Sequence, residues 1–212
     1  MASSYAKHSA TFALGLLLAG GAALAQPPAP PAAVDIAILA ARQLTLPVQG
    51  VAREALTDTF SNARSAGRRH DAIDILAPAG TPVLAVDDGR IAKLFLSKPG
   101  GITLYQFDPS GRYSYYYAHL ERYADGLREG QMVRRGQVIG YVGDTGNARG
   151  GAPHLHFAIA RLPPERSWWK GEAINPYPVL RGLEGAAHTA DNGPSAASPP
   201  LSRRPPGAPD LP

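Results

Sequence analysis

Turn-forming residues divide the middle of this 212-residue chain into short apolar runs, and this punctuation constrains the fold most. The runs "TPVLAV" and "RIAKLFLS" flank Asp88-Gly89, while "ITLYQF" and "YSYYYAHL" flank Asp108-Pro109-Ser110-Gly111. A further short pair lies within "QMVRRGQVIGYVG". Such turn residues join antiparallel strands, and no long stretch keeps the 3.6-residue period of an amphipathic helix. The sequence therefore predicts a mainly β fold, a compact antiparallel β-sheet.

The N-terminal residues predict an export signal. Lys7 precedes an apolar run that closes on Ala23-Leu24-Ala25, the small-x-small pattern of a cleavage site, so we expect a signal peptide over residues 1–25. An uncleaved anchor is the alternative, although the run is short for a membrane span. Residues 26–45 follow as a Pro-rich linker and a short segment, "VDIAILAARQL", that fits either a helix or a strand.

The C-terminal residues 182–212 contain few large apolar side chains and many prolines, which predicts a disordered tail. One folded domain is then expected over residues 46–181. A composition of 44% apolar and 18% charged residues is typical of globular proteins. Since the chain has no cysteine, it has no disulfides, and stability must come from the core or from a metal.

The charge pattern argues against nucleic acid as a partner. The formal net charge is +4, and the chain shows no stripe of lysine and arginine with interleaved aromatic residues. After signal cleavage we expect no stable membrane insertion, and we expect a monomer.

Four of the six histidines fall within the expected domain, and His154 and His156 are two of them. In a strand these two project to one side, while Leu155 and Phe157 project to the other. Taken alone, this pair fits an ordinary polar strand face as well as a metal site.

His70 and Asp74 form a second candidate pair within "HDAID". In a strand they share one face with Ala72, and in a helix their i, i+4 spacing also brings them together. A surface histidine beside an aspartate is the alternative.

By strand alternation, Tyr115, Tyr117 and His119 of "YSYYYAHL" project together, which alone would indicate only an aromatic strand. In combination, the three segments bring four imidazoles and one carboxylate to positions that can face one site. Two histidines, one carboxylate and an open position are typical of catalytic zinc.

The motifs "HDAID", "YAHL" and "GDTGNARGGAPHLHF", with "GTPVLAVDDGRI" and "GQVIGYVG" between them, resemble the LytM/lysostaphin-type zinc metallopeptidases that cut peptidoglycan peptides. The resemblance covers about residues 46–181. It implies a substrate groove walled by loops and one zinc ion bound by His70, Asp74 and His156. It also implies that His119 and His154 act on the attacking water and the transition state. Tyr117 and Asn147, within these segments, are expected to bind substrate.

Two positions depart from the family pattern. Ala72 stands where many members have glycine, and Ala158 stands where acidic or polar residues are common. Neither is a ligand, so the departures bear on specificity. Trp168 and Trp169 leave two readings open: both pack, or one packs while the other lines the groove or stacks on a sugar.

The resemblance predicts an exported zinc endopeptidase, periplasmic or extracellular, that hydrolyses amide bonds in peptidoglycan stem peptides or cross-bridges. A non-catalytic wall-binding or amidase-activating module of the same fold is the alternative. A protease for glycine-rich proteins outside the wall is a third reading.

Overall fold

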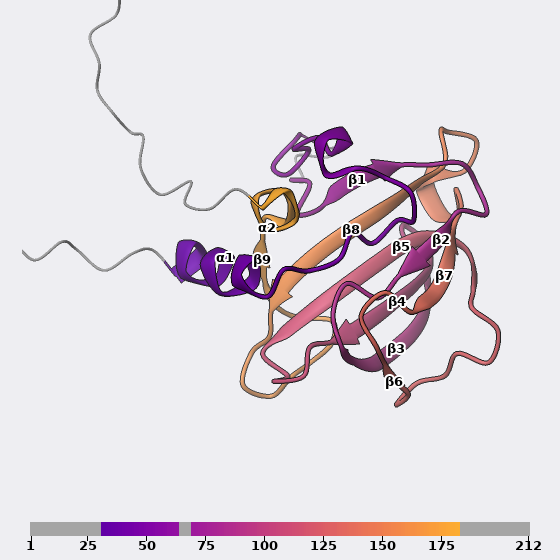
Figure 1. The fold of residues 1–212 in the computed structure, drawn as a ribbon. Coiled ribbons are helices and arrows are strands. Elements are labelled where there is room, and N and C mark those ends of the chain that lie inside the picture. The colour runs from indigo at the N-terminus through magenta and orange to yellow at the C-terminus, as the bar shows by residue number, and fades with distance from the viewer. Residues whose placement is uncertain (1–30, 64–68, 183–212) are drawn as a thin grey trace, which may run out of the picture.

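The structure is a computed structural model that describes residues 31–63 and 69–182 (Figure 1). Within these residues nine strands form one sheet in which every pairing is antiparallel, so the predicted mainly β fold is confirmed. The main path of the sheet is β1-β8-β5-β4-β3-β6, with β9 paired to β8, β7 to β5, and β2 to β7.

The strands, in chain order, are β1 (Ile73–Leu76), β2 (Pro82–Leu84), β3 (Gly89–Ser97), β4 (Gly101–Phe107), β5 (Tyr113–Tyr123), β6 (Met132–Val133), β7 (Val138–Val142), β8 (His154–Arg161) and β9 (Glu172–Ile174). The helical elements are α1 (Pro31–Ala41), α2 (Pro176–Arg181) and the short 3-10 turns η1 (Arg53–Ala55) and η3 (Gly146–Ala148).

The turn between β4 and β5 forms where the sequence predicts it. The Gly111 amide donates to the Asp108 carbonyl at 3.0 Å, and Gly111 adopts a φ of 65°, which glycine reaches without steric cost. The Asp108 carboxylate accepts from the Ser110 amide at 3.2 Å and from the Tyr113 amide at 2.7 Å. This local turn chemistry sets the register of β4 against β5.

The predictions of a hairpin at Asp88-Gly89 and of another within "QMVRRGQVIGYVG" are wrong. β2 pairs with β7 and not with β3, and β6 pairs with β3 and not with β7. β2 is only three residues long, and its other edge is occupied by the N-terminal segment through a bridge between Val48 and Val83. The backbone hydrogen bonds of β2 and β6 therefore go to strands distant in the sequence, and the expected hairpin turns are loops between strands that do not pair.

The core lies against one face of the sheet. Alternate residues of the central strands are fully buried there, and the N-terminal segment adds further apolar side chains: Ile73, Leu104, Tyr115, Tyr117, Leu155, Phe157, Ile159, Leu39, Leu44 and Val48. The residues between them on β1 and β8 point to the opposite face, because strand side chains alternate. That opposite face carries the polar residues of the candidate site.

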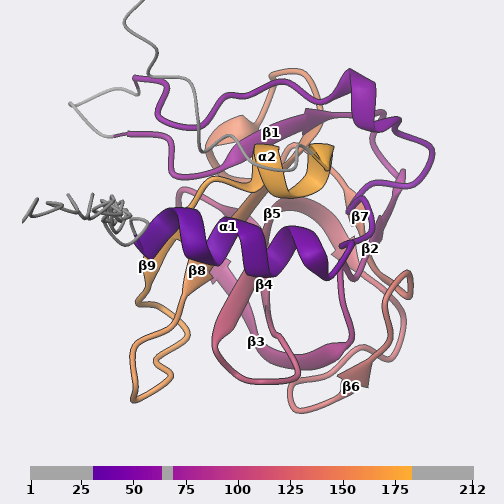
Figure 2. The same ribbon diagram turned by 60° about the vertical axis from the view of Figure 1, so that its left-hand side comes forward.

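The folded body begins before residue 46, so the predicted domain boundary is corrected. Residues 31–41 form the helix α1, so the segment that could be a helix or a strand by sequence is largely helical. α1 lies beside α2 (Figure 2). Leu39 and Leu44 are fully buried in the core. The buried Asp35 accepts from Arg161 Nη1 at 2.6 Å and from the Tyr113 hydroxyl at 2.7 Å, which fastens α1 to the sheet.

The expected signal peptide (1–25) and, apart from Gly182, the expected tail (182–212) lie outside the described residues. Neither helix of the described part combines the length and the apolar character that crossing a bilayer requires.

Candidate metal centre

Three side chains predicted as metal ligands meet at the open face of the sheet. Asp74 on β1 is the direct cross-strand partner of His156 on β8, and His70 lies just before β1. His70 Nε2, Asp74 Oδ1 and His156 Nδ1 are each 3.1 Å from the other two. Ligand atoms of the three lie within 4.8 Å of one another.

This triangle fits a tetrahedral cation. Two ligand atoms bound to zinc at about 2.05 Å in a tetrahedron are separated by roughly 3.3 Å, close to the observed spacing. The donor set of two imidazoles and one carboxylate also suits zinc, and three protein ligands leave one tetrahedral position for water or substrate. The geometry is therefore that of a catalytic metal site.

The N-terminal segment holds the ligands in place through Thr59. The carbonyl of Thr59 accepts from His70 Nδ1 at 2.8 Å, which fixes the proton on Nδ1 and directs the Nε2 lone pair to the metal position. The Thr59 hydroxyl accepts from the Asp74 amide at 3.0 Å. The sequence contains no signal for this role, because Thr59 lies eleven residues before His70 in an irregular segment.

His119 and His154, the two predicted catalytic residues, lie beside the ligands. The ring centroids of His119 and His154 are 5.0 Å apart, and those of His119 and His156 are 5.6 Å apart. His154 Nε2 is 3.9 Å from Asp74 Oδ1. All five predicted ligand and catalytic side chains therefore converge on one place.

Both residues are oriented by backbone carbonyls. His119 Nδ1 donates to the Thr145 carbonyl and His154 Nδ1 donates to the Ala152 carbonyl, each at 2.8 Å. Since a carbonyl only accepts, each neutral ring carries its proton on Nδ1 and leaves Nε2 as an acceptor. Burial lowers the pKa of His119 to about 4, so its ring is neutral at pH 7.

A β-bulge turns His119 toward the site. Between the pairs Leu104–Tyr117 and Ile102–Leu120, two residues of β5 face one residue of β4. His119 occupies the bulge with a φ of 59°, rare for a residue other than glycine. The strict alternation assumed from the sequence therefore ends before His119.

The prediction of Tyr117 as a substrate contact is wrong for the same reason. Tyr117 points to the core face, is fully buried, and donates its hydroxyl to Gln106 at 2.8 Å. Its neighbour Tyr116 faces the site instead, with its ring edge-on to His156 at a centroid distance of 6.0 Å. Alternation alone places the two tyrosines on opposite faces, and the bulge moves His119 to the face of Tyr116.

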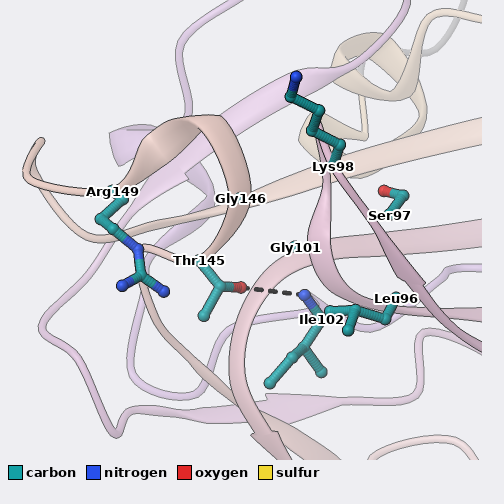
Figure 3. A pocket seen from close by; sticks show the side chains of 8 residues that line it. All are labelled: Leu96, Ser97, Lys98, Gly101, Ile102, Thr145, Gly146 and Arg149. Carbon is teal, nitrogen blue, oxygen red and sulfur yellow. Dashed lines mark hydrogen bonds between the residues drawn. The ribbon is translucent and has the colours of Figure 1, made fainter.

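The predicted substrate residue Asn147 lies in η3, on the loop that follows β7. Its side chain is exposed, and its backbone N–H donates to the Pro99 carbonyl at 2.9 Å. This loop and the β3–β4 turn border an open hollow of about 500 Å³. The Thr145 hydroxyl accepts from the Ile102 amide at 3.0 Å, and Arg149 and Lys98 are among the residues that line the hollow (Figure 3). A role for Asn147 in substrate binding stays a prediction.

The fold and the site together define a metallopeptidase. The profile of Peptidase family M23 matches residues 68–176, more than half of the chain, and the chain belongs to this family. The family assignment agrees with the resemblance drawn from the motifs.

Two curated relatives and one solved structure illustrate the match. The chain is 35% identical over 133 residues to the L-Ala–D-Glu endopeptidase of Bacillus subtilis, covering 59% of this chain and 39% of that protein. It is 38% identical over 118 residues to lysostaphin of Staphylococcus simulans, covering 54% of this chain and 22% of that protein. The chain therefore spans less than half the length of these relatives.

The solved catalytic domain of lysostaphin from Staphylococcus simulans superposes with a TM-score of 0.51 at 28% identity. The match covers 61% of this chain and 95% of that domain. The likeness in structure thus concerns the peptidase domain as a unit.

Proposed function

We propose that the protein is an exported, zinc-dependent endopeptidase that hydrolyses amide bonds in peptidoglycan stem peptides or cross-bridges. The observation that carries the proposal is the triangle of donor atoms from His70, Asp74 and His156, each 3.1 Å from the others, with His119 and His154 beside it.

One zinc ion, held by His70, Asp74 and His156, would polarise a scissile carbonyl and lower the pKa of a bound water to about 7. The chain's own residues supply the remaining functions. The Thr59 carbonyl keeps His70 in the tautomer that offers Nε2, and the pairing of β1 with β8 keeps Asp74 against His156.

His119 and His154 are suited to move protons. In the neutral form of each ring, Nδ1 donates its proton to a backbone carbonyl and Nε2 is the nitrogen that can accept. Either can accept a proton from the attacking water and then, as an imidazolium, donate a hydrogen bond to the developing oxyanion or pass the proton to the leaving amine. The presence of two such groups allows one ring to act as the base, while the other stabilises negative charge once it carries a proton on Nε2.

The substrate and the location rest on the relatives and on the N-terminal sequence. One relative is named as an L-Ala–D-Glu endopeptidase and another as a peptidoglycan DD-endopeptidase, which supports a peptidoglycan peptide as the substrate. The pattern at residues 1–25 supports export to the periplasm or the cell exterior, where such a substrate occurs. The complete set of five side chains supports catalysis over the non-catalytic alternative.

The test uses the full chain, loaded with zinc, and a panel of purified peptidoglycans and cross-linked muropeptides. New amine termini, identified by mass spectrometry, are the expected result, and their absence from every wall type would contradict the proposal. Asp74→Ala is expected to lose zinc and turnover. His119→Ala should keep zinc and lose turnover by about 100- to 1000-fold, the range for loss of one transition-state donor.

Asp71→Ala is the matched control for Asp74→Ala. Asp71 is an exposed carboxylate in the same "HDAID" segment, three residues away from the ligand. It should retain both zinc and turnover, which separates loss of the ligand from a change in local charge.

A further inference from the structure

Five aromatic residues form a continuous row on the same side of the sheet as the metal centre, and we call this row the aromatic stripe. Its members come from three neighbouring strands and from the β8–β9 loop: Phe95 on β3, Tyr105 on β4, Tyr116 on β5, and Trp168 and Trp169 on the loop. Tyr105 and Tyr116 are direct cross-strand partners. The stripe is therefore built into the strand register.

The aromatic stripe begins at a metal ligand and proceeds outward in short steps. Tyr116 lies 6.0 Å from His156, Tyr105 lies 4.5 Å from Tyr116, and Trp168 lies 4.9 Å from Tyr105, all between ring centroids. Trp169 follows at 5.3 Å from Trp168.

The outer end of the aromatic stripe is open to solvent. Trp169 is 62% exposed and Phe95 is 39% exposed, whereas Trp168 is half-buried with its ring 5.2 Å from Phe95. On β8, the residue opposite Tyr116 is Ala158, a small side chain. Exposed aromatic rings that continue from a catalytic centre are typical of a ligand contact.

The charges beside the aromatic stripe are paired internally. Lys93, the cross-strand partner of Tyr105, forms an ion pair with Glu129 at 2.8 Å. Lys170, which follows Trp169, lies 3.7 Å from Glu165. The stripe thus offers flat apolar rings with little net charge, which suits an uncharged sugar ring better than a peptide stem that carries carboxylates and amines.

We propose that the aromatic stripe binds the sugar rings of the glycan strand that carries the scissile peptide, with Trp169 and Trp168 as the outer stacking surfaces. This inference rests on the proposed function, because a sugar polymer joined to the cleaved peptide is what would bring such rings within reach of the metal centre. The C–H faces of a pyranose pack on an aromatic ring, while its hydroxyls remain in water. The stripe would then hold the glycan while the peptide enters the site.

Intrinsic fluorescence tests the inference directly, because Trp168 and Trp169 are the only tryptophans of the chain. Titration of the full chain with the neutral tetrasaccharide of N-acetylglucosamine is expected to change tryptophan emission in a saturable manner. Trp169→Ala should weaken this binding about tenfold, the loss expected for one aromatic contact. The single variants Trp168→Phe and Trp169→Phe identify which ring reports the sugar.

Met132→Ala is the matched control, because Met132 is also an exposed apolar side chain, 68% exposed, and pairs at the opposite end of β3 from Phe95. It should leave the titration unchanged. A tetrasaccharide that causes no change in emission, or a sugar-free cross-linked peptide that causes the larger change, would overturn the inference.

Kinetics provide the second measurement. Trp169→Ala should lower kcat/KM for saccharide-bearing cross-linked muropeptides about tenfold more than for the same cross-linked peptides freed of sugar. An equal loss on both substrates would assign the stripe to the peptide and overturn the inference. If the wild type cleaves neither substrate but binds the tetrasaccharide, the proposed peptidase function fails while the sugar contact stands.

Discussion

The carboxylate of Asp108 provides a sharp test of how the turn between β4 and β5 supports the fold. Its side chain is fully buried and accepts from Ser110 Oγ at 2.5 Å, from the Tyr113 amide at 2.7 Å, and from Arg42 Nη1 at 2.8 Å. One side chain thus closes a turn and also fastens the end of α1 to the sheet. We expect both Asp108→Ala and Asp108→Asn to destabilise the protein.

The expected loss follows from the groups left without a partner. In Asp108→Ala the buried Tyr113 amide loses its acceptor, a cost of about 1–3 kcal/mol, and the charged hydrogen bond to Arg42 is worth a further 1.5–3 kcal/mol or so. Because Arg42 is partly solvated, we expect a total of about 3 kcal/mol, or a fall of roughly 6–12 °C in Tm for a domain of this size. Asp108→Asn keeps one oxygen acceptor and should lose about half as much.

The pH dependence supplies an independent signature. Burial alone would raise the pKa of Asp108, but the hydrogen bonds from Ser110, Tyr113 and Arg42 outweigh it and lower that pKa below its usual value. Stability from this carboxylate is therefore present above the unfolded pKa of about 3.9 and is lost as the pH falls through the lower folded pKa. The difference between wild type and Asp108→Asn should shrink over that range.

Denaturant unfolding of the full chain, followed by circular dichroism from pH 7 down to pH 2, measures both effects. Asp125→Ala is the control, because Asp125 is a fully exposed carboxylate whose contact with Arg122 spans 3.5 Å. The reasoning would be refuted if Asp108→Ala were as stable as Asp125→Ala. It would also be refuted if the difference between wild type and Asp108→Asn did not change in acid.

Three further predictions concern the site. Thr59→Val removes the hydroxyl that accepts from the Asp74 amide and should weaken zinc binding about tenfold, measured by competition with a chromophoric chelator; unchanged affinity would contradict this. Gly101→Ala places a Cβ 2.3 Å from Thr145 Oγ1 at a φ of 65°, so the loop must move and turnover should fall about 100-fold with zinc retained; normal turnover would show that the loop tolerates the methyl group. Tyr117→Phe should lower the unfolding free energy by about 1–2 kcal/mol and leave turnover unchanged. A folded Tyr117→Phe protein with tenfold lower turnover would show that Tyr117 does act in the site.

The two candidate pairs were predictable because the spacing within each pair is local, whereas the choice of His70, Asp74 and His156 as ligands came from the family resemblance. His154 and His156 lie two residues apart in one strand, and His70 and Asp74 lie four residues apart. Each pair therefore shares a face before any tertiary contact is known. Turn chemistry likewise predicted the β4–β5 hairpin through Asp108. In each case the information lies within a few residues of the chain.

The features that escaped prediction depend on distant partners. The bulge at His119 requires a positive φ at a residue that gives no sequence signal, and it reverses the roles of Tyr116 and Tyr117. β2 pairs with β7, more than fifty residues away, because the N-terminal segment occupies its other edge. Leu44 is fully buried in the same core as the sheet residues, a tertiary contact that the ambiguous segment before residue 46 did not indicate.

The Thr59 carbonyl lies upstream of residue 68, where the match to the family profile begins. A recombinant fragment started at that residue would contain every ligand yet lack the acceptor that sets the tautomer of His70. The proposed zinc site therefore depends on the N-terminal segment, and a fragment limited to the residues that match the family profile should bind zinc more weakly than the full chain.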